Sequence, residues 1–305
     1  TEGDTITYQF VVENTGDDGI LIGFVAKVSG DAVVADTVVT NAGTSGIYVG
    51  EVAGEMYVLR STVTGAGEHG VNAHGADGLG VVESTIADST ELGVVGRTVG
   101  TVWISNSTIT GSRRGAAGVY VSDLLVEHST ITGNPMGANM VLFGEAVNSS
   151  GLDSIPTARM LVNNSIVTGN GSAGMFGVRT WDFNPRTLAP YDTAVEYSLV
   201  PAGSEYAGND GNISTNAPKL GKLANNGGPT QTMLPASGSP AINAGNPTTT
   251  GFPTTDQRGN TRIAGGRVDI GSVETSTTGG GGGGGGGDSS GAIVPVAPAR
   301  LLDTR

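Results

Sequence analysis

The stretch Ser107-Thr108-Ile109-Thr110-Gly111 recurs with small changes along the first two thirds of the chain. Close copies occur at 61–65 and 129–133, and weaker copies at 37–41, 84–88, 165–169 and 198–202. The central apolar residue of each copy, here called the anchor, is in turn Val39, Val63, Ile86, Ile109, Ile131, Val167 and Val200. Successive anchors are 24, 23, 23, 22, 36 and 33 residues apart. A repeat of this length indicates a solenoid-like architecture.

Each anchor lies in a fixed pattern of side chains. The position five residues before it is always apolar, and the position two before it is always Ser or Thr. The two positions that flank it are mostly threonines, such as Thr108 and Thr110. Side chains two residues apart share one face of a strand, so the anchor and the hydroxyl face one way and the threonines face the other. We expect Val and Ile stacks inside and threonine ladders outside.

The spacing selects among repeat folds. A βαβ unit needs roughly 30 or more residues, and a propeller blade needs about 40. The Leu-x-x-Leu-x-Leu pattern of leucine-rich repeats is absent. A second short strand is expected eight to ten residues after an anchor, as at 46–49 and 118–121. The sequence therefore predicts an all-β fold, a right-handed parallel β-helix of about seven coils or more over residues 1–215.

The two long intervals predict excursions from the coil, at 136–159 and 176–193. The second contains Trp181, Phe183 and Tyr191, in a chain with only 5% aromatic residues. These rings are candidates for ligand binding, because sugar faces stack on aromatic rings and loops on a rigid scaffold often carry binding sites. The alternative is that the excursions are lids packed on the flank of the helix.

Composition limits the possible partners. The formal net charge of −13 argues against nucleic acid, which requires clustered Lys and Arg. It is compatible with a divalent cation such as Ca²⁺ at an oxygen-lined site, although no cofactor is expected. The absence of cysteine excludes disulfides and thiolate metal sites. No apolar stretch approaches the roughly 20 residues of a membrane span, and we expect a monomer.

The C-terminal third has a different sequence pattern. It includes Leu223-Ala224-Asn225-Asn226-Gly227-Gly228-Pro229, Gly238-Ser239-Pro240-Ala241-Ile242-Asn243-Ala244-Gly245, Thr255-Asp256-Gln257-Arg258-Gly259 and Asp269-Ile270-Gly271-Ser272-Val273-Glu274. This order of motifs resembles the choice-of-anchor Q domain of bacterial surface proteins with β-helical bodies. The resemblance implies export and attachment to, or release from, the cell envelope, and it implies no catalytic activity.

These motifs define the remaining boundaries. Residues 216–275 are expected to cap the solenoid end, since that end exposes core and strand edges. Residues 276–292, with nine consecutive glycines, predict a flexible linker. Residues 293–305 resemble the start of a further β-rich module and are expected to be disordered. The chain opens at Thr1 and stops at Arg305, which suggests an internal piece of a longer protein.

The cap contains most of its charge in one set of residues. We expect a structural ion-pair cluster, with an anion or glycan site as the alternative. The members of this set are Asp256, Arg258, Arg262, Arg267, Asp269 and Glu274.

One column suggests chemistry. Five residues after successive anchors stand Glu68, Glu91 and Arg114, with His69 close by. In this register the two carboxylates would stack about 5 Å apart, which raises one pKa or calls for a cation. The alternative is that Arg114 or Arg113 simply neutralises Glu91 across coils.

A second column, three residues before the anchors, suggests a surface ion-pair ladder. Its members are Asp36, Arg60, Glu83, Asn106, His128, Asn164 and Tyr197.

Three functions are compatible with these patterns. The leading one is a non-catalytic extracellular rod, adhesin-like, that presents loops to glycans or cell-surface proteins. The second is a polysaccharide lyase or glycoside hydrolase that acts in a groove of the β-helix. The third is a structural spacer without a ligand.

Overall fold

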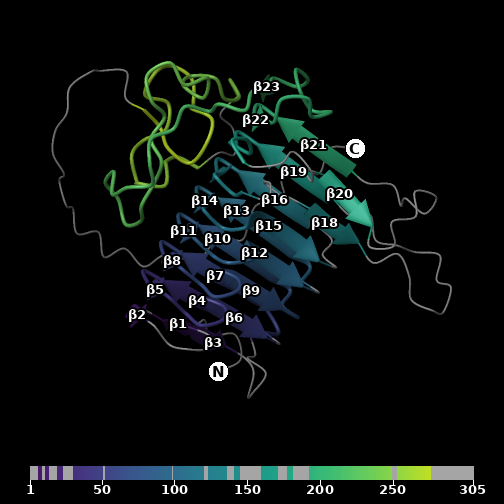
Figure 1. Ribbon diagram of the computed structural model, residues 1–305, viewed down its shortest axis with the longest axis vertical. Helices are drawn as coiled ribbons and strands as arrows, with labels where there is room; N and C mark the ends of the chain where they lie inside the picture. Colours follow the sequence, from purple (N-terminus) through teal and green to yellow (C-terminus); the bar gives the residue numbers. More distant parts are fainter. Residues whose placement is uncertain are drawn as a thin grey trace.

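The computed structural model describes residues 6–8, 11–13, 19–22, 30–50, 52–97, 99–119, 123–135, 141–144, 159–170, 177–180, 192–248 and 253–275. Their secondary structure consists of strands, turns and irregular segments, and the strands stack coil upon coil (Figure 1). Every strand pairing is parallel. The prediction of a parallel β-helix is confirmed.

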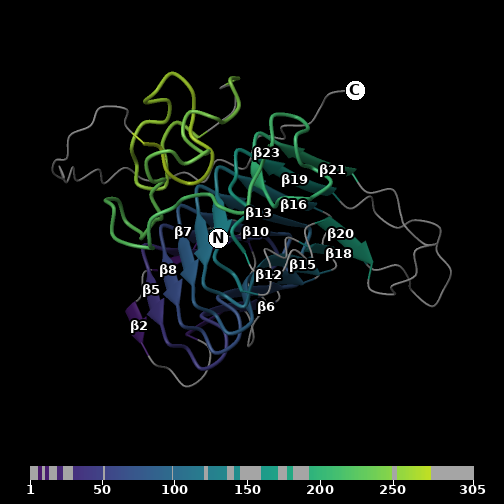
Figure 2. The same cartoon turned by 45° about the horizontal axis from the view of Figure 1, so that its top comes forward.

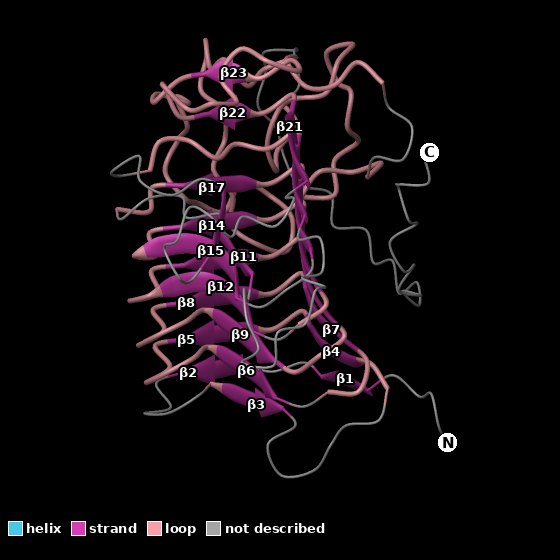
Figure 3. Cartoon of the chain, turned by 90° about the vertical axis from the view of Figure 1, so that its right-hand side faces the viewer, coloured by secondary structure: helices cyan, strands magenta, loops and turns pink. Residues whose placement is uncertain are grey.

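Three long sheets run along the axis, and Figure 3 shows their strands as successive rungs. Sheet A contains β1 (Ile6–Tyr8), β4 (Ala32–Ala35), β7 (Glu55–Leu59), β10 (Gly78–Val82), β13 (Thr101–Ser105), β16 (Asp123–Glu127), β19 (Arg159–Asn163) and β21 (Asp192–Glu196). Sheet B contains β2 (Val11–Glu13), β5 (Val38–Thr40), β8 (Thr62–Thr64), β11 (Thr85–Ala87), β14 (Thr108–Thr110) and β17 (Thr130–Thr132). Sheet C contains β3 (Ile20–Ile22), β6 (Ile47–Gly50), β9 (Val71–His74), β12 (Leu92–Arg97), β15 (Arg114–Val119), β18 (Val141–Gly144) and β20 (Gly177–Thr180). A short pair continues the line of sheet B at the end of the stack: β22 (Leu199–Val200), which carries the last anchor, and β23 (Ile213–Ser214).

Strands β18 and β20 correct the predicted excursions. The ranges 136–159 and 176–193 each include a strand of sheet C, so part of each range belongs to the coil. The coil needs a third strand after each anchor, and β18 begins ten residues after Ile131. The predicted ligand residues Trp181, Phe183 and Tyr191 lie outside the described residues, as do the proposed linker and the final module.

The interior is a stack of aliphatic side chains. All seven anchors, from Val39 to Val200, are fully buried, and equivalent residues pair along sheet B, as Ile86 does with Ile109. Each buried Val or Ile side chain stabilises the fold by roughly 1.5–3 kcal/mol relative to exposure. The predicted inward orientation of the anchors is confirmed.

The hydroxyls two residues before the anchors form a buried ladder. Each backbone N–H in this column donates to the hydroxyl of the next coil at 3.1–3.2 Å, from Thr37 through to Ser165. Each hydroxyl in turn donates to the carbonyl two residues earlier at 2.8 Å. The ladder satisfies polar groups at a corner between sheets A and B, where backbone pairing alone would leave donors unpaired.

The column three residues before the anchors differs from the predicted surface ladder. All seven residues have positive φ, between 43° and 52°, which is costly for residues other than Gly, Asn and Asp. Asp36 and Arg60 do form an exposed pair across coils, at 2.6 Å. Asn106, His128 and Asn164, in contrast, are buried. The ladder is therefore a surface feature only in the N-terminal coils.

Residues 216–275, here called the C-terminal region, explain this difference. Figure 2 shows them beside the upper coils, and their contacts lie along the outer side of sheet B. Gln257 donates to Ser84 O and Thr85 Oγ1, and it accepts from Thr108 Oγ1. The region thus covers the flank of the middle coils, which the sequence did not predict, and it also contacts Leu199 of the last coil. The outer threonine hydroxyls offer repeated hydrogen-bonding partners there.

Apolar contacts join the same two parts. Ile166 and Leu199 of the solenoid pack with Ala241 and Ile270 of the C-terminal region in one buried cluster. The threonines predicted to lie outside do point away from the core, but at β11, β14 and β17 they are covered. Thr62 in β8 stays partly exposed.

Candidate functional site

The predicted column of Glu68, Glu91 and Arg114 is only partly correct. Glu68 and Glu91 lie in adjacent coils, with the Glu91 N–H donating to the Glu68 carbonyl at 2.8 Å. Sheet C pairs Arg114 with Leu92, however, so Arg113 is the residue in register with Glu91. The reason is a turn of different length. Ile86 precedes the inward Val94 by eight residues, whereas Ile109 precedes its partner Ala116 by seven.

Glu91 is neutralised by the neighbouring coil. Its Oε1 lies 2.5 Å from Arg113 Nη1, and the two side chains are 39% and 45% exposed. Exposed pairs of this kind contribute roughly 0–1 kcal/mol. Glu68 is exposed at the same edge. The interpretation in which an arginine neutralises Glu91 is confirmed for Arg113.

The next column, at the edge where the sheet C strands begin, contains a buried histidine. His69 is 8% exposed, and two donors face its ring. Arg97 Nη2 lies 3.0 Å from Nε2, and the Leu92 backbone N–H lies 3.3 Å from Nδ1. Burial and then the charge of Arg97 lower the pKa of His69 to about 4, although Glu91 opposes the shift. The imidazole is therefore neutral at pH 7.

A neutral imidazole has one protonated and one accepting nitrogen. Arginine and a backbone N–H can only donate, so only one of these two contacts can be a hydrogen bond in either tautomer. The arrangement around His69 thus presents two donors to one acceptor. Such a conflict is unusual for a buried polar group.

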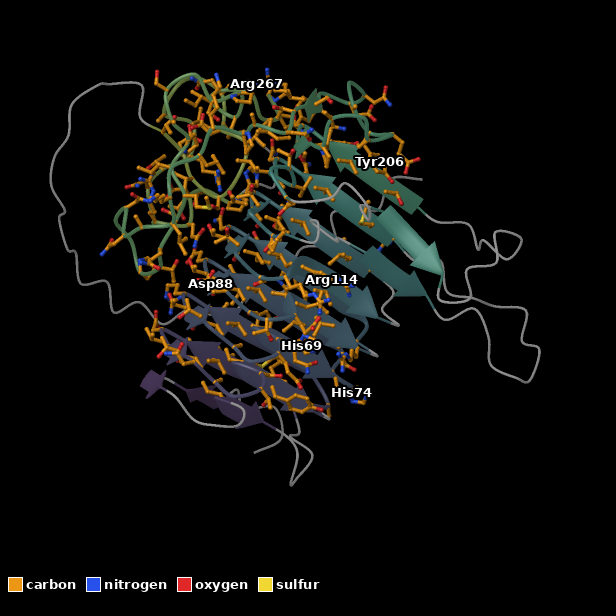
Figure 4. All side chains as sticks on the ribbon, in the orientation of Figure 1. His69, His74, Asp88, Arg114, Tyr206 and Arg267 are labelled. Carbon is orange, nitrogen blue, oxygen red and sulfur yellow. The ribbon has the colours of Figure 1, made fainter. Side chains whose placement is uncertain are left out.

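Two further polar atoms on this side have no protein partner. Asn72 is 5% exposed and its Oδ1 is buried without a hydrogen bond, while its Nδ2 lies 3.5 Å from Ser45 Oγ. Arg114 Nε is also buried and unpaired. Figure 4 shows Arg114, His69 and His74 on the same side of the stack. We call the group of His69, Asn72, Arg97 and Arg114 the sheet C site.

The sheet C site contains two positive charges, Arg97 and Arg114, on adjacent coils, and the Glu91–Arg113 ion pair lies beside it. The whole chain has only 15 Lys and Arg residues. His74 lies at the end of β9, is exposed and pairs in register with Arg97. Asp77 is exposed in the following turn. Within the described ranges, no group of three or more His, Asp or Glu residues could hold a metal ion.

A different carboxyl group stands on the outer face of sheet A. Glu127 is half-buried and accepts a hydrogen bond from Ser105 Oγ at 3.0 Å. Burial raises its pKa, although this bond and the charge of Arg262 oppose the shift. The sheet register places Asn163 and then Glu196 beside it along the axis. The sequence analysis singled out none of these three residues.

The charged set of the C-terminal region comes together in the structure. Asp256 is fully buried and accepts from the backbone N–H groups of Arg258, Asn260 and Glu274, at 2.9–3.0 Å. Its Oδ2 also lies 2.8 Å from Arg258 Nη2.

The other two carboxylates act in the same way. Asp269 accepts from the N–H groups of Asn243 and Thr275, and Glu274 accepts from those of Ala264 and Asp269. These bonds replace strand ladders in a region with little regular structure.

Arginines connect this set to the solenoid. Arg262 Nη2 donates to Asn106 Oδ1 at 2.5 Å and to the Gly271 carbonyl at 3.2 Å. Arg267 donates to the Gly245 carbonyl and lies 5.7 Å from the centre of the Tyr197 ring. The six residues therefore fasten irregular loops to each other and to the flank. They do so mainly through bonds to backbone groups, and Asp256–Arg258 is the one ion pair of the expected cluster that the described residues show.

Comparison with known proteins gives two matches. The family model described as right-handed β-helix region matches residues 18–180, more than half of the chain. The crystal structure of pectate lyase Pel9A aligns with a TM-score of 0.46 and 13% identity, over 88% of this chain and 72% of that chain. No curated protein matches the chain. The part of the chain that the structure describes contains no helix long and apolar enough to cross a membrane.

Proposed function

Because this chain belongs to the right-handed β-helix family, we propose that it is a non-catalytic rod on the outside of a bacterial cell. The rod binds polysaccharide or a cell-surface protein along its side. Stacked sheets and a buried hydroxyl ladder support stiffness, because every coil is hydrogen-bonded to the next. The resemblance of the C-terminal region to the choice-of-anchor Q domain supports the extracellular location.

The observation that carries the proposal is the pairing of Glu91 with Arg113. A catalytic carboxyl group needs a proton affinity matched to its task and a position beside the reacting atom. Glu91 instead forms a solvated ion pair with the coil above it. Two further cross-coil pairs, Asp36–Arg60 and Asp123–Arg159, use charge in the same way.

The test exposes the full chain to a panel of acidic and neutral polysaccharides, with and without Ca²⁺. Retention is measured by pull-down, and cleavage by new reducing ends and unsaturated products. We expect retention without cleavage, unchanged in Glu91→Gln. Cleavage lost in Glu91→Gln would contradict the proposal, whereas no retention on any glycan or cell-surface protein would leave a spacer.

A second candidate, polysaccharide hydrolysis, is favoured by Glu127. Its raised pKa suits a proton donor, and Glu196 stands two strand spacings away, roughly 9.6 Å between Cα atoms. Inverting glycosidases hold their two carboxyl groups about 6.5–9.5 Å apart, which leaves room for the attacking water. The Cα separation of Glu127 and Glu196 is just above this range, so their side chains would have to lean toward each other. Glu127 would protonate the leaving oxygen while Glu196 takes a proton from that water.

Matched variants separate the two candidates. Hydrolysis predicts new reducing ends that disappear in Glu127→Gln and Glu196→Gln but persist in Glu91→Gln. Binding without turnover in all four proteins would remove this candidate and leave the rod.

A further inference from the structure

The sheet C site carries one inference, which rests on the proposed glycan-binding function. We propose that His69, Arg97 and Arg114 bind an anionic group of a glycan, a carboxylate or a sulfate, and that Asn72 accepts a hydrogen bond from a neighbouring sugar hydroxyl. The argument starts from the conflict at His69, where two donors face one acceptor.

A ligand anion resolves this conflict. Of the two contacts in the free protein, the one between Arg97 Nη2 and Nε2 is shorter, at 3.0 Å against 3.3 Å, so we infer that the free imidazole carries its proton on Nδ1. If Arg97 turns its guanidinium to the anion, His69 Nδ1 accepts from the Leu92 N–H and the proton moves to Nε2. The Nε2–H group then becomes a donor to the same anion. One anion thereby satisfies both Arg97 and His69, and charge-assisted bonds of this kind are the strong ones.

The register places the remaining groups around that anion. Arg114 occupies the same column as His69, two coils further along, with Leu92 between them. Its unpaired Nε is a donor without an acceptor. An arginine forks to a carboxylate or sulfate through two parallel N–H bonds, so this position suits the same anionic group or the next one along a polymer.

Asn72 indicates a sugar rather than a simple ion. Arg97 pairs in register with His74 but reaches His69 on the preceding coil, and Asn72 lies between these two positions in the sequence. We infer that a turn of Arg97 to the ligand also exposes Asn72 Oδ1. This atom is an acceptor and cannot bind an anion, but it can accept from a hydroxyl.

The axial repeat supports a polymer as the ligand. Equivalent positions on adjacent coils are about 4.8 Å apart, and His69 and Arg114 are two coils apart. Their backbones are therefore separated by about 10 Å, a distance that a pair of linked sugar residues can span. The formal net charge of −13 repels an anionic polymer at long range, so its binding would depend on the close contacts with Arg97 and Arg114.

The experiment measures binding to the full chain by calorimetry and ¹⁵N NMR. The probes are an oligogalacturonate for carboxylate, a heparin-derived oligosaccharide for sulfate, a neutral cello-oligosaccharide and inorganic sulfate. We expect one anionic oligosaccharide to bind at least about tenfold more tightly than inorganic sulfate, with no binding of the neutral probe. Saturation should shift His69 from the Nδ1–H to the Nε2–H tautomer, a signal readable among three histidines.

Matched variants test the residues. Arg97→Gln should weaken binding about 10- to 100-fold, because charged hydrogen bonds contribute about 1.5–3 kcal/mol. Arg60→Gln removes the same charge from the opposite corner and should change affinity less than about twofold. Asn72→Leu should weaken binding of the oligosaccharide and leave binding of inorganic sulfate unchanged.

The outcomes separate this site from the general function. Glycan binding that survives Arg97→Gln, or saturation without a tautomer shift, would overturn the site and leave the rod proposal intact. Equal affinity for inorganic sulfate and the oligosaccharide would overturn the glycan assignment. If none of the polysaccharides in the wider panel is retained, glycan binding fails as a function, and the site fails with it.

Discussion

The N-terminal and C-terminal coils of this solenoid use the same column of residues in opposite ways. In the N-terminal coils Asp36 and Arg60 form an exposed ion pair. In the C-terminal coils Asn106, His128 and Asn164 occupy equivalent positions with the same left-handed backbone, but they are buried beneath the C-terminal region. A repeat therefore determines backbone geometry, while what covers each coil determines the energetics of its side chains.

The largest expected effect comes from Asp256, in the C-terminal region that covers the later coils. Asp256→Ala leaves three backbone N–H groups and the Arg258 charge without their buried partner. Breaking a buried charged network costs about 3–5 kcal/mol. We expect that loss in the free energy of unfolding of the C-terminal region, measured by urea denaturation.

The matched variant in the N-terminal coils, which the C-terminal region does not cover, is Asp36→Ala. Its partner Arg60 stays solvated, so the expected loss is about 0–1 kcal/mol. Equal losses for the two variants would contradict the division into covered and open coils.

A substitution at Gln257 tests how the C-terminal region is attached to sheet B. Gln257→Ala removes hydrogen bonds to Ser84 O, Thr85 Oγ1 and Thr108 Oγ1 at a fully buried position. Unpaired buried groups cost about 1–3 kcal/mol, so we expect a destabilisation of about 2–3 kcal/mol. Hydrogen exchange should show faster exchange at 255–258 and 271–273, with β5 and β8 unchanged. Global unfolding without this local phase would contradict a separately detachable region.

The sequence allowed the coil to be predicted but not its covering. Anchors such as Ile109 and the buried hydroxyl of Ser107 follow from spacing alone, because each coil repeats the same inward and outward choice. The sequence pattern of the outward Thr85 and Thr108 is the same whether their hydroxyls bond to water or to Gln257. Only the three-dimensional contacts distinguish these cases.

The candidate site was predictable to a similar extent. Stacking of Glu68 and Glu91 follows from the repeat, but one residue fewer in the turn before β15 puts Arg113, not Arg114, beside Glu91. The contact between His69 and Arg97 spans 28 residues and combines a turn with the far end of a strand, so no column reveals it. The sequence offered one indication that Arg97 has a role: it is an outward-facing arginine in a strand with no other charged residue.

Acid should destabilise the fold through its buried histidines. Burial and then the charge of Arg262 hold the pKa of His128 well below 6.5. Just below pH 6.5, therefore, His128 is protonated in the unfolded chain but not in the folded chain. Stability therefore falls as the pH drops below about 6.5, by about 1.4 kcal/mol per pH unit for this histidine. His69, with its pKa lowered to about 4, adds a similar slope down to that pH.

The variant His128→Asn isolates this contribution. Asn already occupies the equivalent positions 106 and 164 and tolerates the left-handed backbone. The raised pKa values of Glu127 and Glu274 act in the opposite direction, since the folded state takes up those protons first, but they are common to both proteins. Denaturation at several pH values should give a difference that grows to about 2 kcal/mol near pH 5; parallel curves would rule out a buried neutral His128.

The smallest effect is expected at Glu91 and Arg113, in an uncovered stretch of the solenoid. Both side chains are more than a third exposed, so water already solvates each charge and the 2.5 Å contact adds little. A double-mutant cycle with Glu91→Ala and Arg113→Ala should give a coupling of roughly 0.2–1 kcal/mol that declines as salt is raised. A coupling above about 2 kcal/mol that resists salt would mean that this edge is covered too. The column would then belong with Asn106 and His128 rather than with Asp36 and Arg60.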